Sequence, residues 1–167
     1  MKSDFLVDCL IPSNNINITT LETLKSLQNY DFLRIILVCD MDAAVNRDAI
    51  QQIRYQIKNI IIVENTIQKG LPGTLNSGLA HCLAPFVMRL DDGDINIRAD
   101  LYKDLCNWPE DLDMKCFNIQ LFTQEKKLEV VKCKVTKSLG ALSLYARVPH
   151  PTWIFKRERV KIFYGLD

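Results

Sequence analysis

Residues 86–94 read FVMRLDDGD, a short apolar run that leads directly into three acidic residues around a glycine. The apolar part predicts a buried strand, and Asp91, Asp92 and Asp94 follow where that strand ends. Carboxylates this close repel one another, and a divalent cation bound between them would remove the repulsion. Gly93 allows a sharp turn that lets the carboxylates converge, and hard oxygen ligands suit Mg²⁺ or Mn²⁺. The alternative is a solvated acidic turn that caps the following helix.

The chain before this stretch alternates between nearly continuous apolar runs and segments with helical spacing. This order is typical of a parallel sheet covered by helices on both faces. Pro12 is expected to end the first strand, and residues 70–73 are expected to form a loop. The predicted strands cover residues 5–11, 33–38, 59–63 and 86–90. One predicted helix begins after a cap at Thr19 or Thr20, and two further helices cover 48–57 and 74–83.

The chain after the acidic residues predicts a helix and a small antiparallel hairpin. No linker, internal repeat or low-complexity tract interrupts the sequence, so residues 1–167 are predicted to form a single α/β domain. The predicted elements here are a helix over 100–108, hairpin strands over 114–122 and 128–135 with a turn at 124–127, a loop over 148–152 and a short strand over 153–155.

The composition is that of an ordinary soluble globular protein. Hydrophobic residues make up 48% of the chain and charged residues 25%, and the net charge is +1. A nearly neutral chain offers no electrostatic basis for bulk nucleic-acid binding, and no apolar run is long enough to span a bilayer. The six cysteines include no Cys-x-x-Cys pair, so no zinc site is expected and they are interpreted as small core residues. Without a signal-peptide pattern after Met1, the chain is expected to be cytoplasmic.

Polar residues follow the predicted strands, and ligands of parallel sheets bind beyond those strand ends. Ser13 and Asn14 follow the first strand, Asp40 the second and Asn65 the third. Asp40 has two interpretations, because its carboxylate could accept a hydrogen bond from a nucleotide base or could cap a helix. Asn65, with Gly70 and Asn76 after it, could likewise serve a ligand loop or a turn and helix start. The residues alone leave both alternatives open.

The chain contains two histidines. His81 falls in the middle of a predicted helix and is interpreted as structural. His150 lies between two prolines, which would fix a loop that could aim the ring into a cleft, so it has a functional and a structural interpretation. Neither a Ser/His/Asp order nor a Gly-x-x-x-x-Gly-Lys phosphate loop is present.

The order of these motifs resembles that of the family-2 glycosyltransferases, which have the GT-A fold. The resemblance spans nearly the whole chain, and it depends on five motifs that occur in the family's order. They are Leu10-Ile11-Pro12-Ser13-Asn14-Asn15 in place of Ile-Pro-Thr-Tyr-Asn, Val38-Cys39-Asp40 in place of Val-Asp-Asp, Asn65 to Gly70 with Asn76-Ser77-Gly78 in place of two Asn-x-Gly segments, Arg89-Leu90-Asp91-Asp92-Gly93-Asp94-Ile95 in place of Leu-Asp-x-Asp-Asp, and His150-Pro151-Thr152 in place of His-Pro-Thr.

The resemblance implies a Rossmann-like, mostly parallel sheet flanked by helices, with a nucleotide-binding half over 1–95 and an incomplete acceptor-side half over 96–167. It implies inverting transfer of a sugar from a nucleotide-diphospho-sugar, with a UDP-sugar favoured, to a saccharide or lipid-linked acceptor in surface polysaccharide synthesis. No nucleic-acid partner and no transmembrane segment are implied, while peripheral membrane contact stays open.

The resemblance also assigns roles to residues. Mn²⁺ or Mg²⁺ would be held by Asp92 and Asp94, and His150 would line the acceptor side. The residues expected to bind the nucleotide-sugar are Pro12, Ser13, Asn14, Asp40, Asn65, Gly70, Asn76, Arg89, Asp91 and Asp92.

The chain departs from the family pattern in three places. Gly93 stands where the second metal-binding Asp is expected, and Asp94 would restore the pair one residue later. Cys39 and Met41 stand where the base-binding motif has an Asp and a Gly. No counterpart of the Glu-Asp pair that supplies the family's catalytic base follows, so the general base is expected to be absent.

Two alternatives stay open. A nucleotidyltransferase would also combine a parallel sheet with paired aspartates, but it usually has a Gly-rich basic loop after its first strand, which Ser13-Asn14-Asn15 does not provide. A truncated, catalytically impaired nucleotide-sugar-binding or assembly protein is the second alternative. The missing base motif favours it, and the acidic cluster argues against it.

Overall fold

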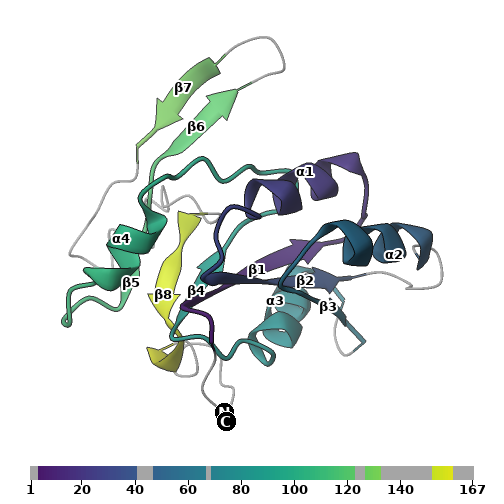
Figure 1. Cartoon of the computed structure of the whole chain (residues 1–167), viewed down its shortest axis with the longest axis horizontal. Coiled ribbons are helices and arrows are strands. Elements are labelled where there is room, and N and C mark those ends of the chain that lie inside the picture. The colour runs from purple at the N-terminus through teal and green to yellow at the C-terminus, as the bar shows by residue number, and fades with distance from the viewer. Residues whose placement is uncertain (1–3, 41–46, 67–68, 123–126, 133–151, 160–167) are drawn as a thin grey trace.

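The computed structural model of the chain describes residues 4–40, 47–66, 69–122, 127–132 and 152–159. Figure 1 shows a twisted sheet with helices on both faces and a separate hairpin that projects away from it. The helices are α1 (Ile18–Ser26), α2 (Arg47–Gln56), α3 (Leu71–Leu79) and α4 (Leu101–Cys106). The strands are β1 (Val7–Ser13), β2 (Leu33–Cys39), β3 (Ile60–Glu64), β4 (Phe86–Arg89), β5 (Met114–Lys115), β6 (Ile119–Phe122), β7 (Lys127–Val131) and β8 (Ile154–Lys156).

The main sheet has six strands in the order β3-β2-β1-β4-β8-β5. The first four are parallel, and β8 runs antiparallel to both β4 and β5. This arrangement confirms the predicted mostly parallel sheet, and β6 and β7 form the predicted antiparallel hairpin. Because the strand order places β1 between β2 and β4, the carboxyl ends of these three strands meet at one edge of the sheet.

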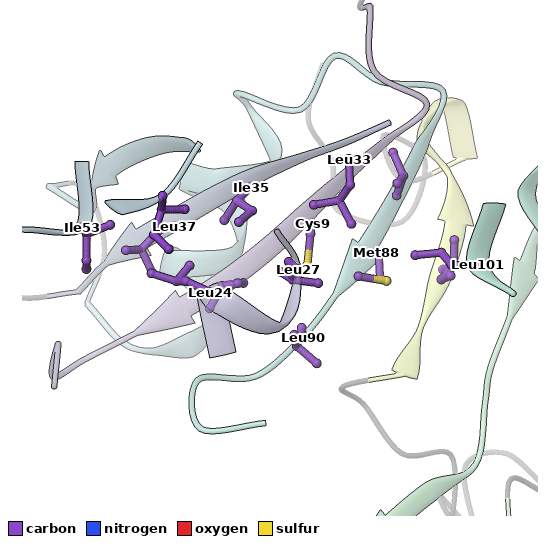
Figure 2. Close-up of a cluster of buried hydrophobic side chains, with 14 of the residues drawn as sticks. Cys9, Leu24, Leu27, Leu33, Ile35, Leu37, Ile53, Met88, Leu90 and Leu101 are labelled. Carbon is purple, nitrogen blue, oxygen red and sulfur yellow. The ribbon is translucent and has the colours of Figure 1, made fainter. Parts of the chain in front are cut away.

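The two faces of the sheet carry separate cores. On the face covered by α1 and α2, Cys9 of β1 and Leu37 of β2 belong to one buried cluster with Leu24 of α1 and Ile53 of α2 (Figure 2). On the opposite face, Leu10 of β1 packs with Leu79 of α3 and its neighbours. This two-residue alternation fixes the register, because a shift by one residue would exchange the two faces.

The first strand does not end before Pro12 as predicted. It continues to Ser13, with Pro12 opposite Val38 of β2. The pairing with β4 stops where Leu10 faces Arg89, so Pro12 has a strand partner on one side within the described residues. Proline lacks a backbone donor and is tolerated where a strand has a free side.

The start and end of α3 also differ from the prediction. Residues 71–73 belong to the helix, because Gly70 is its N-cap and Pro72 lies in the first turn, where no backbone donor is needed. The helix ends at Leu79, so His81 lies after it and not in its middle. The exposed His81 ring is hydrogen-bonded through Nδ1 to the carbonyl of Ser77 at 2.9 Å.

The stretch predicted as one strand over 114–122 is divided between two sheets. β5 pairs with β8 in the main sheet, and β6 pairs with β7 in the hairpin. Between them, the backbone N–H of Phe117 donates to the hydroxyl of Thr152 at 3.1 Å, not to a neighbouring strand. A side-chain partner therefore interrupts the ladder at this point.

Candidate functional site

A cleft of about 300 Å³ opens where the carboxyl ends of β1, β2 and β4 meet the first turn of α3. Its walls contain every residue expected to bind the nucleotide-sugar except Asn65 and Asn76. The lining residues are Pro12, Ser13, Asn14, Asp40, Gly70, Leu71, Thr74, Arg89, Asp91 and Asp92.

Asp92 is held on one side of this cleft by two hydroxyl groups. The Ser13 hydroxyl donates to Asp92 Oδ2 at 2.5 Å, and the Thr20 hydroxyl donates to the same oxygen at 3.0 Å. The other oxygen, Oδ1, is buried and accepts no hydrogen bond from the described residues. A buried carboxylate oxygen without a partner is unfavourable, so this atom is suited to a ligand that supplies positive charge or a donor.

Arg89 and Asp91 form an ion pair on the same wall. The Arg89 Nε lies 2.7 Å from Asp91 Oδ1, and its Nη2 lies 3.2 Å from Oδ2. The Arg89 side chain is 12% exposed and that of Asp91 is 35% exposed, so the pair is partly shielded from water. Both charged groups of the pair border the cleft.

Asp94 lies outside the lining of the cleft, on a turn in which its backbone N–H donates to the Asp91 carbonyl at 3.0 Å. Gly93 has a φ of 94° there, which confirms that the turn requires a glycine-type conformation. Partial burial raises the pKa of Asp94, the charge of Asp91 raises it further, and Arg89 opposes both effects.

The first two acids have separate partners in this structure, and the assignment of Asp92 and Asp94 to a metal stays a prediction. Asp91 pairs with Arg89, Asp92 accepts from the hydroxyls of Ser13 and Thr20, and Asp94 is not part of the cleft lining. No group of three His, Cys, Asp or Glu side chains that could hold a metal ion occurs in the ranges that the structure describes.

The opposite wall is organised by Asp40, which accepts two hydrogen bonds. Its Oδ1 accepts from Asn65 Nδ2 at 2.8 Å, and its Oδ2 accepts from the backbone N–H of Gly70, the N-cap of α3, at 2.6 Å. Asn65 lies behind this wall, 8% exposed. Its Nδ2 also reaches Thr74 Oγ1 at 3.3 Å, and its Oδ1 accepts from the Ser77 hydroxyl at 2.9 Å. Asn65 therefore joins the ends of β2 and β3 to α3.

The set of residues at the cleft differs in several positions from the set that the sequence predicted. Asn76 lies on α3 outside the cleft lining, and His150 lies outside the described residues. Thr20, Leu71 and Thr74 contribute to the site but were missed. Thr20 falls within the apolar spacing of α1, which is a signal for a buried hydroxyl, whereas Leu71 carries no signal because Gly70, Pro72 and Gly73 predict a loop around it.

The sequence matches the model of the family described as Glycosyl transferase family 2 over residues 9–157. The chain belongs to this family. The match covers most of the chain and includes both walls of the cleft. The comparison with curated proteins gave no match.

This family 2 glycosyltransferase chain resembles solved structures of low sequence identity. A mannosyltransferase from Pyrobaculum calidifontis, in complex with GDP-Man and Mn²⁺, has a TM-score of 0.68 at 14% identity, over 95% of this chain and 46% of that one. S. aureus TarS 1–349, in complex with UDP-GlcNAc, has a TM-score of 0.64 at 18% identity, over 98% and 47%. The likeness confirms the GT-A fold, and the chain spans about half the length of these two proteins.

The same fold also appears in the 4-diphosphocytidyl-2C-methyl-D-erythritol synthase of Anaerococcus prevotii, with a TM-score of 0.60 at 12% identity over 97% of this chain and 74% of that one. The fold therefore does not by itself distinguish between these activities. Within the described ranges, no helix is long and apolar enough to cross a membrane.

Cys39 is one of the positions at which this family 2 chain departs from the family motif. Its side chain is 1% exposed and belongs to the core under α1 and α2. Burial raises the pKa of the Cys39 thiol to about 11, and the charges of Glu64 and Asp92 add to the increase. A neutral, buried thiol offers the cleft no charge, so Asp40 provides the acidic group at the end of β2.

Proposed function

We propose that the cleft binds a nucleotide-diphospho-sugar together with a divalent cation, and that the chain is the donor-binding part of a glycosyltransferase. The observation that carries this proposal is the buried Oδ1 of Asp92 at the cleft wall, which has no partner among the described residues, in a chain of glycosyl transferase family 2. The acceptor would be a saccharide or lipid-linked molecule, and the chain would act in the cytoplasm as part of surface polysaccharide synthesis.

The nucleotide would occupy the side of the cleft formed by β1, β2 and the start of α3. Asp40 supplies acceptor oxygens there, and Pro12 and Asn14 border the same space. Leu71 is 48% exposed and provides an apolar surface beside these polar groups. A few polar groups beside an apolar wall are typical of sites that bind small molecules.

The diphosphate would lie toward Asp92 and Arg89. We propose that Asp92 and Asp94 hold Mn²⁺ or Mg²⁺, for which carboxylate oxygens are suitable ligands. The cation, when bound, would stabilise the negative charge of the departing diphosphate. Asp91 neutralises Arg89 through their ion pair, so the wall does not add an unpaired cation beside the metal.

A general base must remove the proton of the acceptor hydroxyl, and no described residue is assigned to this role. His150 stays a proposal for the acceptor side. We therefore propose that this polypeptide binds donor and metal and transfers sugar slowly or not at all. Rapid turnover by this polypeptide alone would contradict the second part of that statement.

Calorimetry with UDP-GlcNAc and GDP-mannose, each with and without Mn²⁺, tests the proposal. We expect Mn²⁺-dependent binding of one nucleotide-sugar, and a loss of about tenfold or more in affinity for Asp92→Asn, which removes a charge without changing the side chain's shape. Asp113→Asn is the matched control, because Asp113 pairs with Arg159 at an exposed position away from the cleft lining. Failure of the wild-type chain to bind any nucleotide would favour the assembly role instead.

A further inference from the structure

One face of α1 carries three hydroxyl side chains at intervals of three residues: Thr20, Thr23 and Ser26. The Thr20 hydroxyl donates to Asp92 Oδ2 at 3.0 Å. One turn further along the helix, the Thr23 hydroxyl accepts from the backbone N–H of Gly93 at 3.0 Å. Thr20 and Thr23 thus make the first two of a row of contacts to the segment that follows β4 and carries the acids, which we call the acidic loop.

The row continues toward the carboxyl end of α1. The Ser26 hydroxyl donates to the Thr23 carbonyl at 2.6 Å and accepts from the backbone N–H of Asn96 at 3.1 Å. Beyond the helix, the Tyr30 hydroxyl donates to the Arg98 carbonyl. The loop therefore follows α1 over residues 92–98, although more than 65 residues separate the partners in sequence.

Burial makes these contacts specific. Thr20 and Thr23 are both 0% exposed, and a buried hydroxyl without a partner is unfavourable. Their partners are the acid at the cleft and the backbone of the next residue, which has a φ of 94°. An apolar side chain of similar shape would fill the same space but could not set the position of either group.

We propose that Thr20, Thr23 and Ser26 are positioning residues for the donor site, because they hold the acidic loop so that Asp92 keeps one oxygen free toward the ligand. This inference rests on the proposed function. Ser13 and Thr20 occupy Oδ2, and Oδ1 is buried without a hydrogen-bond partner among the described residues. Thr23 and Ser26 hold the backbone that follows Asp92, while Ser13 and Thr20 hold its carboxylate.

Thr20→Val tests the first contact, because it removes the hydroxyl and keeps the branched shape. We expect the affinity for the Mn²⁺–nucleotide-sugar complex to fall about tenfold in Thr20→Val and to return to within about twofold of wild type in Thr20→Ser. Thr20 also accepts from the Asn17 backbone N–H in the capping box of α1. Asn17→Ala is therefore the control: it weakens the cap and lowers stability, but it should leave affinity unchanged.

Amide hydrogen exchange provides a second measurement that needs no ligand. The Gly93 amide should exchange faster in Thr23→Val and be protected again in Thr23→Ser, and the Asn96 amide should exchange faster in Ser26→Ala. If Asp92→Asn weakens binding while Thr20→Val does not, the proposed function stands and this inference is wrong. If the wild type binds no nucleotide but the amides respond as expected, the donor site is wrong and only the attachment of the loop to α1 stands.

Discussion

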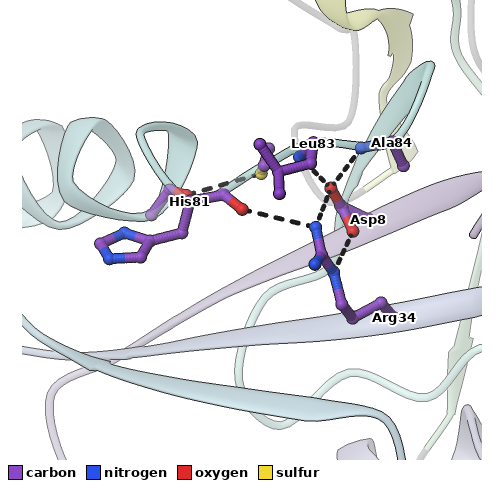
Figure 3. A network of polar contacts seen from close by, with 7 residues as sticks. Asp8, Arg34, His81, Leu83 and Ala84 are labelled. Carbon is purple, nitrogen blue, oxygen red and sulfur yellow. Dashed lines mark hydrogen bonds and ion pairs between the residues drawn. The ribbon is translucent and has the colours of Figure 1, made fainter. Parts of the chain in front are cut away.

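Asp8 of β1 and Arg34 of β2 face each other across the two neighbouring strands and form a buried, two-point ion pair. Arg34 Nε lies 2.7 Å from Asp8 Oδ1, and Arg34 Nη2 lies 2.9 Å from Oδ2 (Figure 3). Asp8 also accepts from the backbone N–H groups of Leu83 and Ala84, at 2.6 and 2.8 Å. The pair therefore connects the sheet to the segment between α3 and β4, at the end of α3 far from the cleft.

Arg34→Met should destabilise the protein strongly. Asp8 is 0% exposed, so removing its partner leaves an uncompensated buried charge, and we expect a loss of about 3–5 kcal/mol in the free energy of unfolding. Urea denaturation would measure the loss. Arg159→Ala is the control, because its ion pair with Asp113 is about half exposed on both sides, and it should change the stability by about 0–1 kcal/mol. Equal effects of the two substitutions would contradict the role given to Asp8 and Arg34.

Gly78→Ala should be destabilising because α3 lies very close to the sheet at this position. A Cβ atom there would overlap the Leu10 side chain and lie 2.6 Å from Val38 Cγ2. We expect a loss of about 1–3 kcal/mol or more, as for other overpacked cores. Gly70→Ala provides the contrast, because no heavy atom lies within 4 Å of the added Cβ, but a φ of 92° with a ψ of 168° is almost exclusive to glycine and costs about 1–3 kcal/mol through the backbone alone. A neutral Gly78→Ala in chemical denaturation would show that the helix can move away from the sheet.

Asn65→Asp should disturb the wall of the cleft formed by Asp40. It replaces a donor with an acceptor at a hydrogen bond of 2.8 Å, and we expect a loss of about 1–3 kcal/mol in stability. The double variant Asp40→Asn/Asn65→Asp places a donor opposite an acceptor again and should recover part of that loss. A double-mutant cycle measured by denaturation checks this coupling. Strictly additive effects would mean that the two side chains do not depend on each other.

The cysteines should differ in reactivity according to their burial. Burial raises the pKa of the Cys39 thiol to about 11 and that of Cys82 to about 12, whereas Cys106 is exposed. Iodoacetamide near neutral pH should therefore label Cys106 and leave Cys39 and Cys82 intact until the protein unfolds, as peptide mapping by mass spectrometry would show. Labelling of Cys39 at the rate of Cys106 in the folded protein would contradict its place in the core.

The same shifts predict how stability changes in alkaline solution. Unfolding returns the Cys39 and Cys82 thiols to their ordinary pKa of 9.0, so above that pH the folded state binds more protons than the unfolded state. Stability should therefore fall as pH rises from about 9 toward 11. Cys39→Ser/Cys82→Ala should flatten this decline in thermal melts recorded across the range. An unchanged slope would show that other groups control the alkaline transition.

The sequence predicted the sheet well because its strands are buried on both faces and therefore read as continuous apolar runs. It also placed Asp40, Asp91 and Asp92 at strand ends, and these residues border the cleft. It failed for Pro12, because local turn chemistry does not reveal that β4 has already ended beside that residue. Whether a strand has one neighbour or two depends on chain segments distant in sequence.

The hydrogen-bond partners of the acids could not be predicted from the sequence for a related reason. Ser13 and Thr20 reach Asp92 across separations of 79 and 72 residues, and no spacing rule covers such distances. Asn65 was assigned to ligand binding because it follows a strand, but its amide is used to join Asp40 to α3. The sequence predicted that Gly93 and a bound cation would let the acids converge, whereas Arg89 pairs with Asp91 and the two hydroxyls donate to Asp92.

The unequal lengths of β1 and β4 have a consequence for which changes in amino-acid sequence this fold can accept. Ser13 ends β1 three residues past Leu10, so β1 extends about 10 Å beyond its pairing with β4, and the acidic turn lies beside that extension. Substitutions in this turn would change what borders the end of β1 without altering any strand pairing that precedes it. New ligand preferences can therefore arise by changes in the loops, while the packed interior stays as it is.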